Sequence, residues 1–123
     1  MTREKALQIK MGEIDENTVY LIEKDGFTFD GKIFSLSQAA QLSNTQLATG
    51  IALGVITEAN SFPFPISAMD NSLYNLQWSD VNAFFGTMAS TIKTIKLSGS
   101  TIKNTINGLA TVQEILTYPD NRV

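Results

Sequence analysis

Two stretches of the chain alternate apolar and polar positions around a turn signal, which is the pattern of a β-hairpin. The first covers residues 26–36, where Asp30-Gly31 lies between apolar runs and favours a type I′ turn, whose twist matches that of paired strands. With these two residues as the loop, Phe27 lies opposite Phe34, so one face collects aromatic rings and is buried. The β-branched and aromatic stretch 18–22 predicts a strand just before this hairpin.

The second hairpin pattern surrounds Asp70-Asn71. Residues 66–69 precede this pair and residues 73–78 follow it, with apolar and amide side chains alternating along the second segment. The pattern predicts either a second hairpin or a pair of short extended segments. We interpret Trp78, at the end of this segment, as a core anchor rather than as a platform for a ligand.

Longer segments repeat apolar residues every three to four positions and predict helices. The first helix begins after Ser37, an N-cap residue, and the proline-containing segment 60–65 ends it. Gly50 and Gly54 lie on or beside its apolar stripe, where the missing Cβ costs about 0.5–1 kcal/mol each. We therefore expect both glycines to allow another element to approach closely.

The last third of the chain predicts two helices joined by a short glycine turn, an αα-hairpin. Ser79 is expected to cap the first helix, and Ser98-Gly99-Ser100 is expected to separate it from a second helix that runs from Thr101 to Tyr118. These apolar stripes favour packing within the chain, with a coiled-coil seam to another chain as the alternative. The residues predicted to contact other chains are Trp78, Tyr74, Ile92, Ile95, Ile102, Ile106 and Leu109.

The first 17 residues carry a weaker pattern. Residues 1–11 are compatible with a frayed helix or a strand, and the acidic segment 12–17 with a loop, so 1–17 could be a mobile arm; nothing here resembles a signal peptide. The whole chain, 1–123, is then predicted as a single α+β domain. It would consist of a small antiparallel sheet of hairpins packed with about three helices over 18–96, and a helical extension over 97–123.

Composition points to assembly rather than to charged ligands. Apolar residues make up 43% of the 123-residue chain and charged residues 17%. With so few charges, parts of the surface are expected to be neutral, and neutral groups can be desolvated against other subunits at lower cost than ions. The net charge of −3 and the absence of a basic run argue against nucleic acid. Residues 33–57 carry no charge but are too polar to span a membrane. Lys93 and Lys96 are assigned to a helix end rather than to a phosphate site.

Catalytic patterns are missing from the sequence. The chain has no histidine and no cysteine, the glycines form no phosphate-binding motif, and the acids at 13–16 lack the spacing of a calcium loop. Asp70 and Asp80 are the one carboxylate pair that could come close enough for acid–base catalysis. A structural role is the better explanation of each, because Asp70 precedes Asn in a turn and Asp80 suits the first turn of a helix. We therefore predict a protein that is not an enzyme, with no catalytic residues, no cofactor and no metal.

Several of these features recur in a set order along residues 25–96: Asp30-Gly31, Phe34 with Ser37, a neutral helix, a proline break, Met69-Asp70-Asn71, the strand to Trp78, and Ser79-Asp80-Val81. This order resembles a family of domains of unknown function found in bacteriophage tail fibre, baseplate and tail-assembly proteins. Two features depart from it, because Met69 replaces an aromatic residue and 97–123 lies outside the pattern.

The resemblance implies a virion structural protein of the tail or baseplate, attached to other phage tail proteins and to copies of itself. The alternative that it implies is a tail-fibre assembly chaperone that is not retained in the mature virion. Either role would place the protein in the host cytoplasm during assembly, and the first would place it in the virion tail afterwards. The family supplies no catalytic residues.

Overall fold

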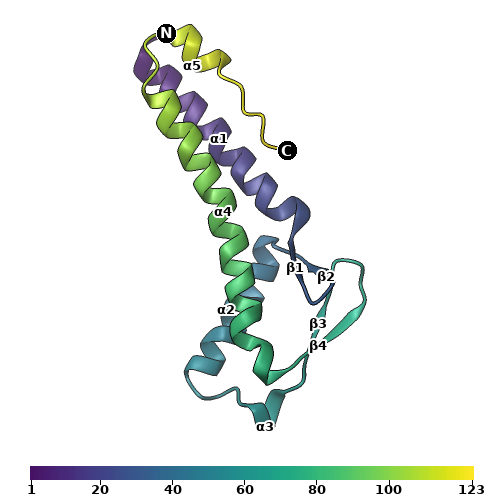
Figure 1. Ribbon diagram of the computed structural model, residues 1–123. Helices are drawn as coiled ribbons and strands as arrows, with labels where there is room; N and C mark the ends of the chain where they lie inside the picture. Colours follow the sequence, from purple (N-terminus) through teal and green to yellow (C-terminus); the bar gives the residue numbers. More distant parts are fainter. The chain divides into compact units, whose positions relative to one another are not determined.

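The computed structural model describes all 123 residues and contains five α-helices, one 3₁₀ helix and two antiparallel sheets of two strands each (Figure 1). The predicted small α+β class is confirmed. In chain order the elements are α1 (Arg3–Asp25), β1 (Phe27–Phe29), β2 (Lys32–Phe34), α2 (Gln38–Ala52), α3 (Glu58–Ser61), β3 (Phe64–Ser67), β4 (Leu73–Leu76), the 3₁₀ helix η1 (Trp78–Asp80), α4 (Val81–Asn107) and α5 (Val112–Thr117).

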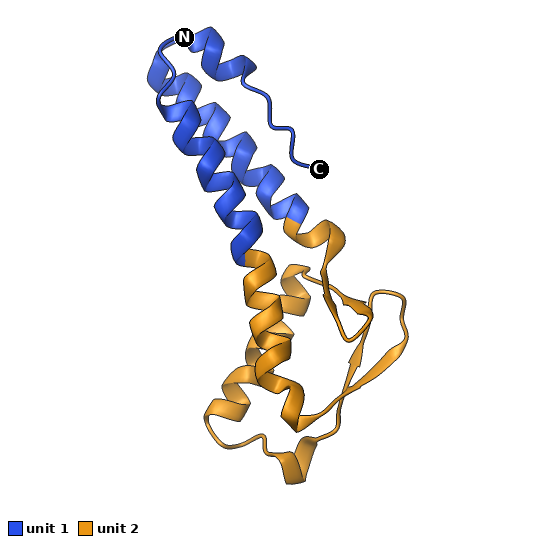
Figure 2. Cartoon of the chain, in the orientation of Figure 1, with its two compact units in different colours: residues 1–21, 93–123 blue, residues 22–92 orange.

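The chain divides into two compact units (Figure 2). Unit 1 comprises residues 1–21 and 93–123, and unit 2 comprises residues 22–92. Because α1 and α4 cross the boundaries, each of these helices contributes residues to both units. These boundaries differ from the predicted ones at residues 17 and 96.

The first hairpin of unit 2 has the predicted turn and register. Asp30 and Gly31 adopt positive φ values of 50° and 75°, which suits the type I′ turn, and Phe27 pairs with Phe34. The rings of Phe27, Phe34 and Phe84 lie 5.1–5.6 Å apart between centroids. All three are buried, so the hairpin and the start of α4 share an aromatic core.

The second hairpin is also confirmed, with strands slightly displaced from the predicted bounds. β3 and β4 pair antiparallel, with Ile66 opposite Tyr74, and Asn71 turns the chain at φ 65°. Trp78 belongs to the 3₁₀ helix η1 rather than to the strand. The expected Ser79 cap is therefore wrong, because the helical turn has already begun at Trp78, after Gln77.

Helix α2 begins as predicted and ends earlier. Ser37 caps it by accepting a hydrogen bond from the Ala40 amide at 3.2 Å, but the helix stops at Ala52 instead of reaching the proline segment. Gly50 is a site of close approach, since a Cβ there would lie 2.5 Å from Ile56 Cδ1. Gly54 is not; it has open space around it and serves the positive φ of 75° that follows the helix end.

Unit 1 corrects the predictions for the N-terminal segment. Residues 12–17, expected as a loop, and 18–22, expected as a strand, both belong to α1. The buried core of the unit joins Ala6 and Ile14 of α1 to Ile106 of α4 and Ile115 of α5. Lys10 lies between Ala6 and Ile14 and is also buried. This charged residue interrupts the apolar stripe of α1, so hydrophobic periodicity did not predict the helix.

The predicted break at Ser98-Gly99-Ser100 is wrong, because α4 is continuous to Asn107. Gly99 is buried, and a Cβ there would lie 2.5 Å from Thr18 Oγ1, so this glycine allows α1 to pack closely against α4. The chain does end in two helices, but the turn between them covers residues 108–111. Thr111 then starts α5 with a capping box.

Basic residues of α1 satisfy the carbonyl ends of the other two helices of unit 1. The Arg3 guanidinium donates to the Asn107 carbonyl at 2.7 Å and to the Leu109 carbonyl at 2.9 and 3.0 Å. Lys10 Nζ lies 3.4 Å from the Leu116 carbonyl. Both cations stand at the negative end of a helix dipole. Lys93 and Lys96 do not, because they lie inside α4, which corrects their assignment to a helix end.

The C-terminal residues return to the helix pair of unit 1 through Arg122. Its guanidinium donates to Thr18 Oγ1 at 2.9 Å, to Ser98 Oγ at 3.2 Å and to the Ile14 carbonyl at 3.1 Å. It also pairs with Asp120 at 2.8 Å, and this hydrogen-bonded partner holds the pKa of the Asp120 carboxyl well below its usual range. We call this arrangement the arginine clamp.

Candidate interaction surface

Tyr74, predicted to contact other chains, is half-buried at the junction of the two hairpins of unit 2. Its ring packs edge-on against Phe29 and Phe34, with centroids 6.2 and 5.4 Å away. Its hydroxyl donates to Asp30 Oδ2 at 2.9 Å. Burial of the phenol, and then this hydrogen bond, raise the pKa of Tyr74 to about 12. Tyr74 therefore joins the turn of the first hairpin to β4.

Trp78 is 37% exposed, so it is less enclosed than a core anchor would be. Its indole packs edge-to-face on Phe62 with centroids 5.1 Å apart, and Phe62 in turn lies 6.0 Å from Phe64. One side of the tryptophan is held by this aromatic contact and part of its surface meets solvent.

The candidates on α4 and beyond it divide by burial. Ile92 and Ile95 are half-buried. Ile102 and Leu109 pack against the core of unit 1, and Ile106 is 0% exposed within it. Ile106 therefore offers no surface to another chain, which corrects that prediction. The elements that cover it are α5 and α1, and the sequence pattern had assigned the first 17 residues to an arm.

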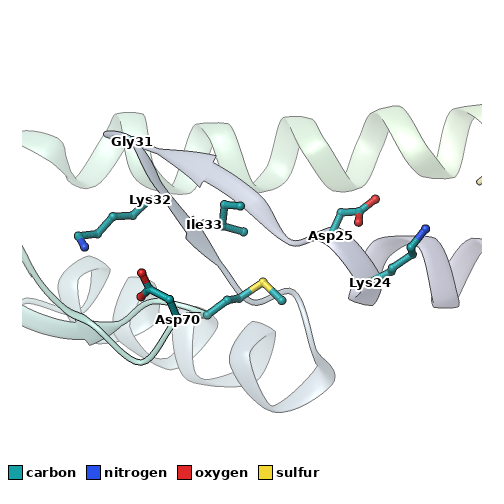
Figure 3. Close-up of a pocket in the computed structure, with 7 residues that line it drawn as sticks. Lys24, Asp25, Gly31, Lys32, Ile33 and Asp70 are labelled. Carbon is teal, nitrogen blue, oxygen red and sulfur yellow. The ribbon is translucent and has the colours of Figure 1, made fainter.

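Unit 2 contains a cleft of about 510 Å³. Figure 3 shows Lys32 and Asp70 at one end and Lys24 and Asp25 at the other, with Ile33 between them. The end of α1, the first hairpin and the turn between β3 and β4 supply its walls. We call it the hairpin cleft, and it is lined by Lys24, Asp25, Gly31, Lys32, Ile33, Met69 and Asp70.

Hydrogen bonds between the two hairpins hold the hairpin cleft in shape. The Met69 amide donates to the Ile33 carbonyl at 2.8 Å, and Lys32 Nζ donates to Ser72 Oγ at 2.7 Å. Ser72 also donates from its amide to Asp70 Oδ1 at 2.9 Å. Each bond links residues of the cleft or its rim, so the two hairpins form one connected wall.

The floor of the hairpin cleft is apolar and its ends are charged. Ile33 and Met69 are 48% and 45% exposed, and both line the cleft. Each end carries one lysine and one aspartate, so the charges of the lining sum to zero. Hydrogen bonds from the Ser72 side chain and then from its backbone lower the pKa of Asp70, which is therefore a carboxylate at neutral pH. Such a lining suits an apolar side chain with polar neighbours better than an isolated ion.

The structure was also compared with the requirements of a metal site and of a membrane span, and the chain with known proteins. No group of three or more metal-ligating side chains comes together, and Glu13, Asp15 and Glu16 lie on α1 rather than in a loop. No helix of the chain has the length and apolar character needed to cross a bilayer. No family model matches the chain, and neither curated proteins nor solved structures gave a match.

The residues of the hairpin cleft were not selected from the sequence as a site. Met69 and Asp70 drew attention only as part of a turn motif, and Ile33 as a strand residue. The available signal was the alternation in β2, which places Ile33 on the face opposite the buried Phe34. That the two hairpins share one wall depends on contacts between residues 36 or more positions apart in the sequence.

Proposed function

We propose that this protein acts by attachment to other proteins, as a structural component of a bacteriophage tail or baseplate. The observation that carries the attachment role is the hairpin cleft, in which exposed Ile33 and Met69 lie between two ends that each carry one lysine and one aspartate. Leu73, which is 63% exposed at the start of β4, extends the exposed apolar surface of the second hairpin. Apolar anchors with a polar rim are the usual composition of protein interfaces.

The phage context rests on the family resemblance, and the two arguments meet at the same residues. Three members of the resembling motifs, Gly31, Met69 and Asp70, line the hairpin cleft. Trp78, another of the motif residues, presents part of its indole to solvent. Motif residues that serve attachment are expected to line a cleft or to be exposed to solvent, as these residues are.

A non-catalytic role is part of the proposal. A general acid needs a carboxyl whose pKa is raised toward neutrality, whereas the pKa of Asp70 is lowered. Its neighbour Ser72 donates hydrogen bonds to it from both backbone and side chain, as is common in turns.

Mass spectrometry of purified tail particles tests the proposal. We expect the protein in mature particles, and we expect Met69→Lys, which places a charge on the apolar floor, to lower its incorporation. Leu97→Lys is the matched control, since Leu97 is 61% exposed on α4 in unit 1. Both variants must retain the wild-type circular dichroism spectrum.

Two outcomes would change the conclusion. A protein that binds fibre protein in infected-cell lysate but is depleted from particles is an assembly chaperone, and the structural role is then wrong. A protein that binds no tail component in either place, or whose incorporation is insensitive to Met69→Lys, overturns the assignment of the cleft.

A further inference from the structure

The turn between α4 and α5 begins with an exposed asparagine followed by a glycine. Asn107 is the last residue of α4, Gly108 comes directly after it, and both are exposed. The main-chain carbonyl of Asn107 accepts a hydrogen bond from Arg3, whereas its side-chain amide is not hydrogen-bonded within the chain. Because glycine has no side chain, it leaves its own amide nitrogen open to the carboxamide of the residue before it.

The fold does not require a glycine at position 108. Its φ lies outside the left-handed region, unlike the φ values of Gly26, Gly31 and Gly54. A Cβ added to Gly108 would lie 3.5 Å from the Thr105 carbonyl oxygen, which is an ordinary van der Waals contact. Neither a turn conformation nor a close approach therefore explains this glycine, and alanine would fit in its place.

We propose that Asn107 is a site of spontaneous deamidation through a cyclic imide, and that Arg3 slows the reaction by holding the Asn107 carbonyl. In the first step the Gly108 nitrogen bonds to Cγ of Asn107 and the bond from Cγ to the side-chain nitrogen breaks. That nitrogen leaves as ammonia, taking up the proton of the Gly108 amide. Water then opens the imide at either carbonyl and gives aspartate or isoaspartate, so the reaction consumes one water and needs no oxidant or cofactor.

Hydrogen bonds hold the two reacting groups apart. Ring closure requires rotation about the Cα–C bond of Asn107, and this rotation moves the Asn107 carbonyl and the Gly108 amide together, because the peptide group is planar. Arg3 Nη2 donates to that carbonyl at 2.7 Å, and the Gly108 amide donates to the Thr105 carbonyl at 3.1 Å. The reaction must break both bonds. The bond from Arg3 is the stronger of the two because its donor is charged.

Either product changes the connection between α4 and α5. Both place a carboxylate at the C-terminal end of α4, which is the negative end of the helix dipole. Isoaspartate also adds a methylene to the main chain before Gly108, which displaces the Leu109 carbonyl from Arg3, its hydrogen-bond donor at 2.9 and 3.0 Å. We therefore expect α5, which places Ile115 in the core of unit 1, to open more often after the reaction. This inference does not rest on the proposed function.

Peptide mapping by mass spectrometry, after incubation of the full chain in mildly alkaline buffer, tests the proposal. Trypsin releases residues 104–122 as one peptide, so Asn104 and Asn121 are measured beside Asn107 as internal controls. We expect deamidation at Asn107 before either control, with isoaspartate among the products. Gly108→Ala should suppress it, and Arg3→Ala should accelerate it by about tenfold through the loss of charged hydrogen bonds.

Arg122→Ala controls for a general loss of stability, because Arg122 donates to Thr18, Ser98 and Ile14 and not to the turn after α4. It should leave the rate at Asn107 unchanged. Equal rates at all three asparagines, or a rate that Gly108→Ala does not lower, overturn the modification site.

The protective role of Arg3 is tested separately. An unchanged or slower rate in Arg3→Ala, or equal acceleration by the two arginine variants, overturns it. Hydrogen exchange of the deamidated fraction, separated by its added charge, should rise over residues 112–117, which form α5. Unchanged exchange there overturns the predicted opening of α5.

Discussion

The hydroxyl of Tyr74 donates a hydrogen bond to Asp30 Oδ2 at 2.9 Å, and through this bond β4 is tied to the turn of the first hairpin. Asp30 has two roles at once, since it adopts the positive φ of 50° that the turn requires and accepts this bond. Together with the contacts of Met69 and Lys32, the bond fixes the wall of the hairpin cleft.

Removing the Tyr74 hydroxyl should loosen this connection while the ring stays packed. We expect Tyr74→Phe to lower the free energy of unfolding by about 1–2 kcal/mol, because a hydrogen bond to an aspartate contributes more than one between neutral groups. Urea denaturation gives the difference. Tyr20→Phe, at a side chain 58% exposed on α1, should change stability little; equal effects of the two substitutions would contradict the structural role of the bond.

The same bond predicts a loss of stability in strong base. The folded-state pKa of Tyr74 is raised to about 12 from an ordinary value of 10.0, so folding favours the protonated phenol. Its contribution is complete below about pH 10 and is lost as pH rises toward 12. The melting temperatures of wild type and Tyr74→Phe should therefore converge between pH 10 and 12. A constant difference across this range would exclude the coupling.

Two glycines of α4 should respond to alanine with opposite signs. Alanine is a better helix former than glycine by about 1 kcal/mol, and Gly86 has nothing within 4 Å of an added Cβ, so Gly86→Ala should stabilise the protein. At Gly99 the added Cβ would lie 2.5 Å from Thr18 Oγ1 and 3.0 Å from Arg122 Nη1, so Gly99→Ala should destabilise it. Thermal denaturation of both variants is sufficient; stabilisation by Gly99→Ala would mean that α1 is not packed there.

The arginine clamp should hold the C-terminal residues in place. Arg122→Ala removes several charged hydrogen bonds, and we expect it to lower the free energy of unfolding by about 2 kcal/mol and to increase hydrogen exchange of the backbone around residues 118–123. Arg3→Ala is an informative comparison, because it should instead expose the end of α4 near Asn107. Unchanged exchange at the C-terminus in Arg122→Ala would contradict the clamp.

The clamp also has a predicted acid dependence. The pKa of Asp120 is lowered from its ordinary 3.8, first by the hydrogen bond from Arg122, so the folded state favours the carboxylate. This stabilisation is complete above about pH 4 and is lost as pH falls further. Asp120→Asn should consequently be less stable than wild type at pH 7, and the difference should shrink below about pH 4. A difference independent of pH would show that the charge of Asp120 contributes nothing.

The features that could be predicted are those that short segments specify on their own. Asp30-Gly31 favours positive φ at both positions, whatever surrounds it, and that turn then sets Phe27 opposite Phe34. Ser37 caps α2 through a bond to an amide three residues away. In each case the interacting residues are close together in the sequence, so the interaction can be predicted from the sequence alone. The α+β class followed from these local signals.

The candidate surface was not predicted as a site. None of the residues predicted to contact other chains lines the hairpin cleft. Trp78 is partly exposed elsewhere in unit 2, whereas Ile106 is enclosed by α1 and α5. A stripe of isoleucines has the same spacing whether its partner is another helix of the chain or another molecule. The residue order alone therefore did not separate core from interface.

The remainder was decided by contacts between residues far apart in the chain. Gly99 resembles a helix break in isolation, yet its missing Cβ makes room for Thr18, and α4 continues through it. Arg3 and Lys10 weaken the apolar pattern of α1, yet they satisfy carbonyl groups about a hundred residues away. Local chemistry determines turns and caps because it acts within a few residues. Burial and close packing depend on which segments meet, and only the folded chain brings those segments together.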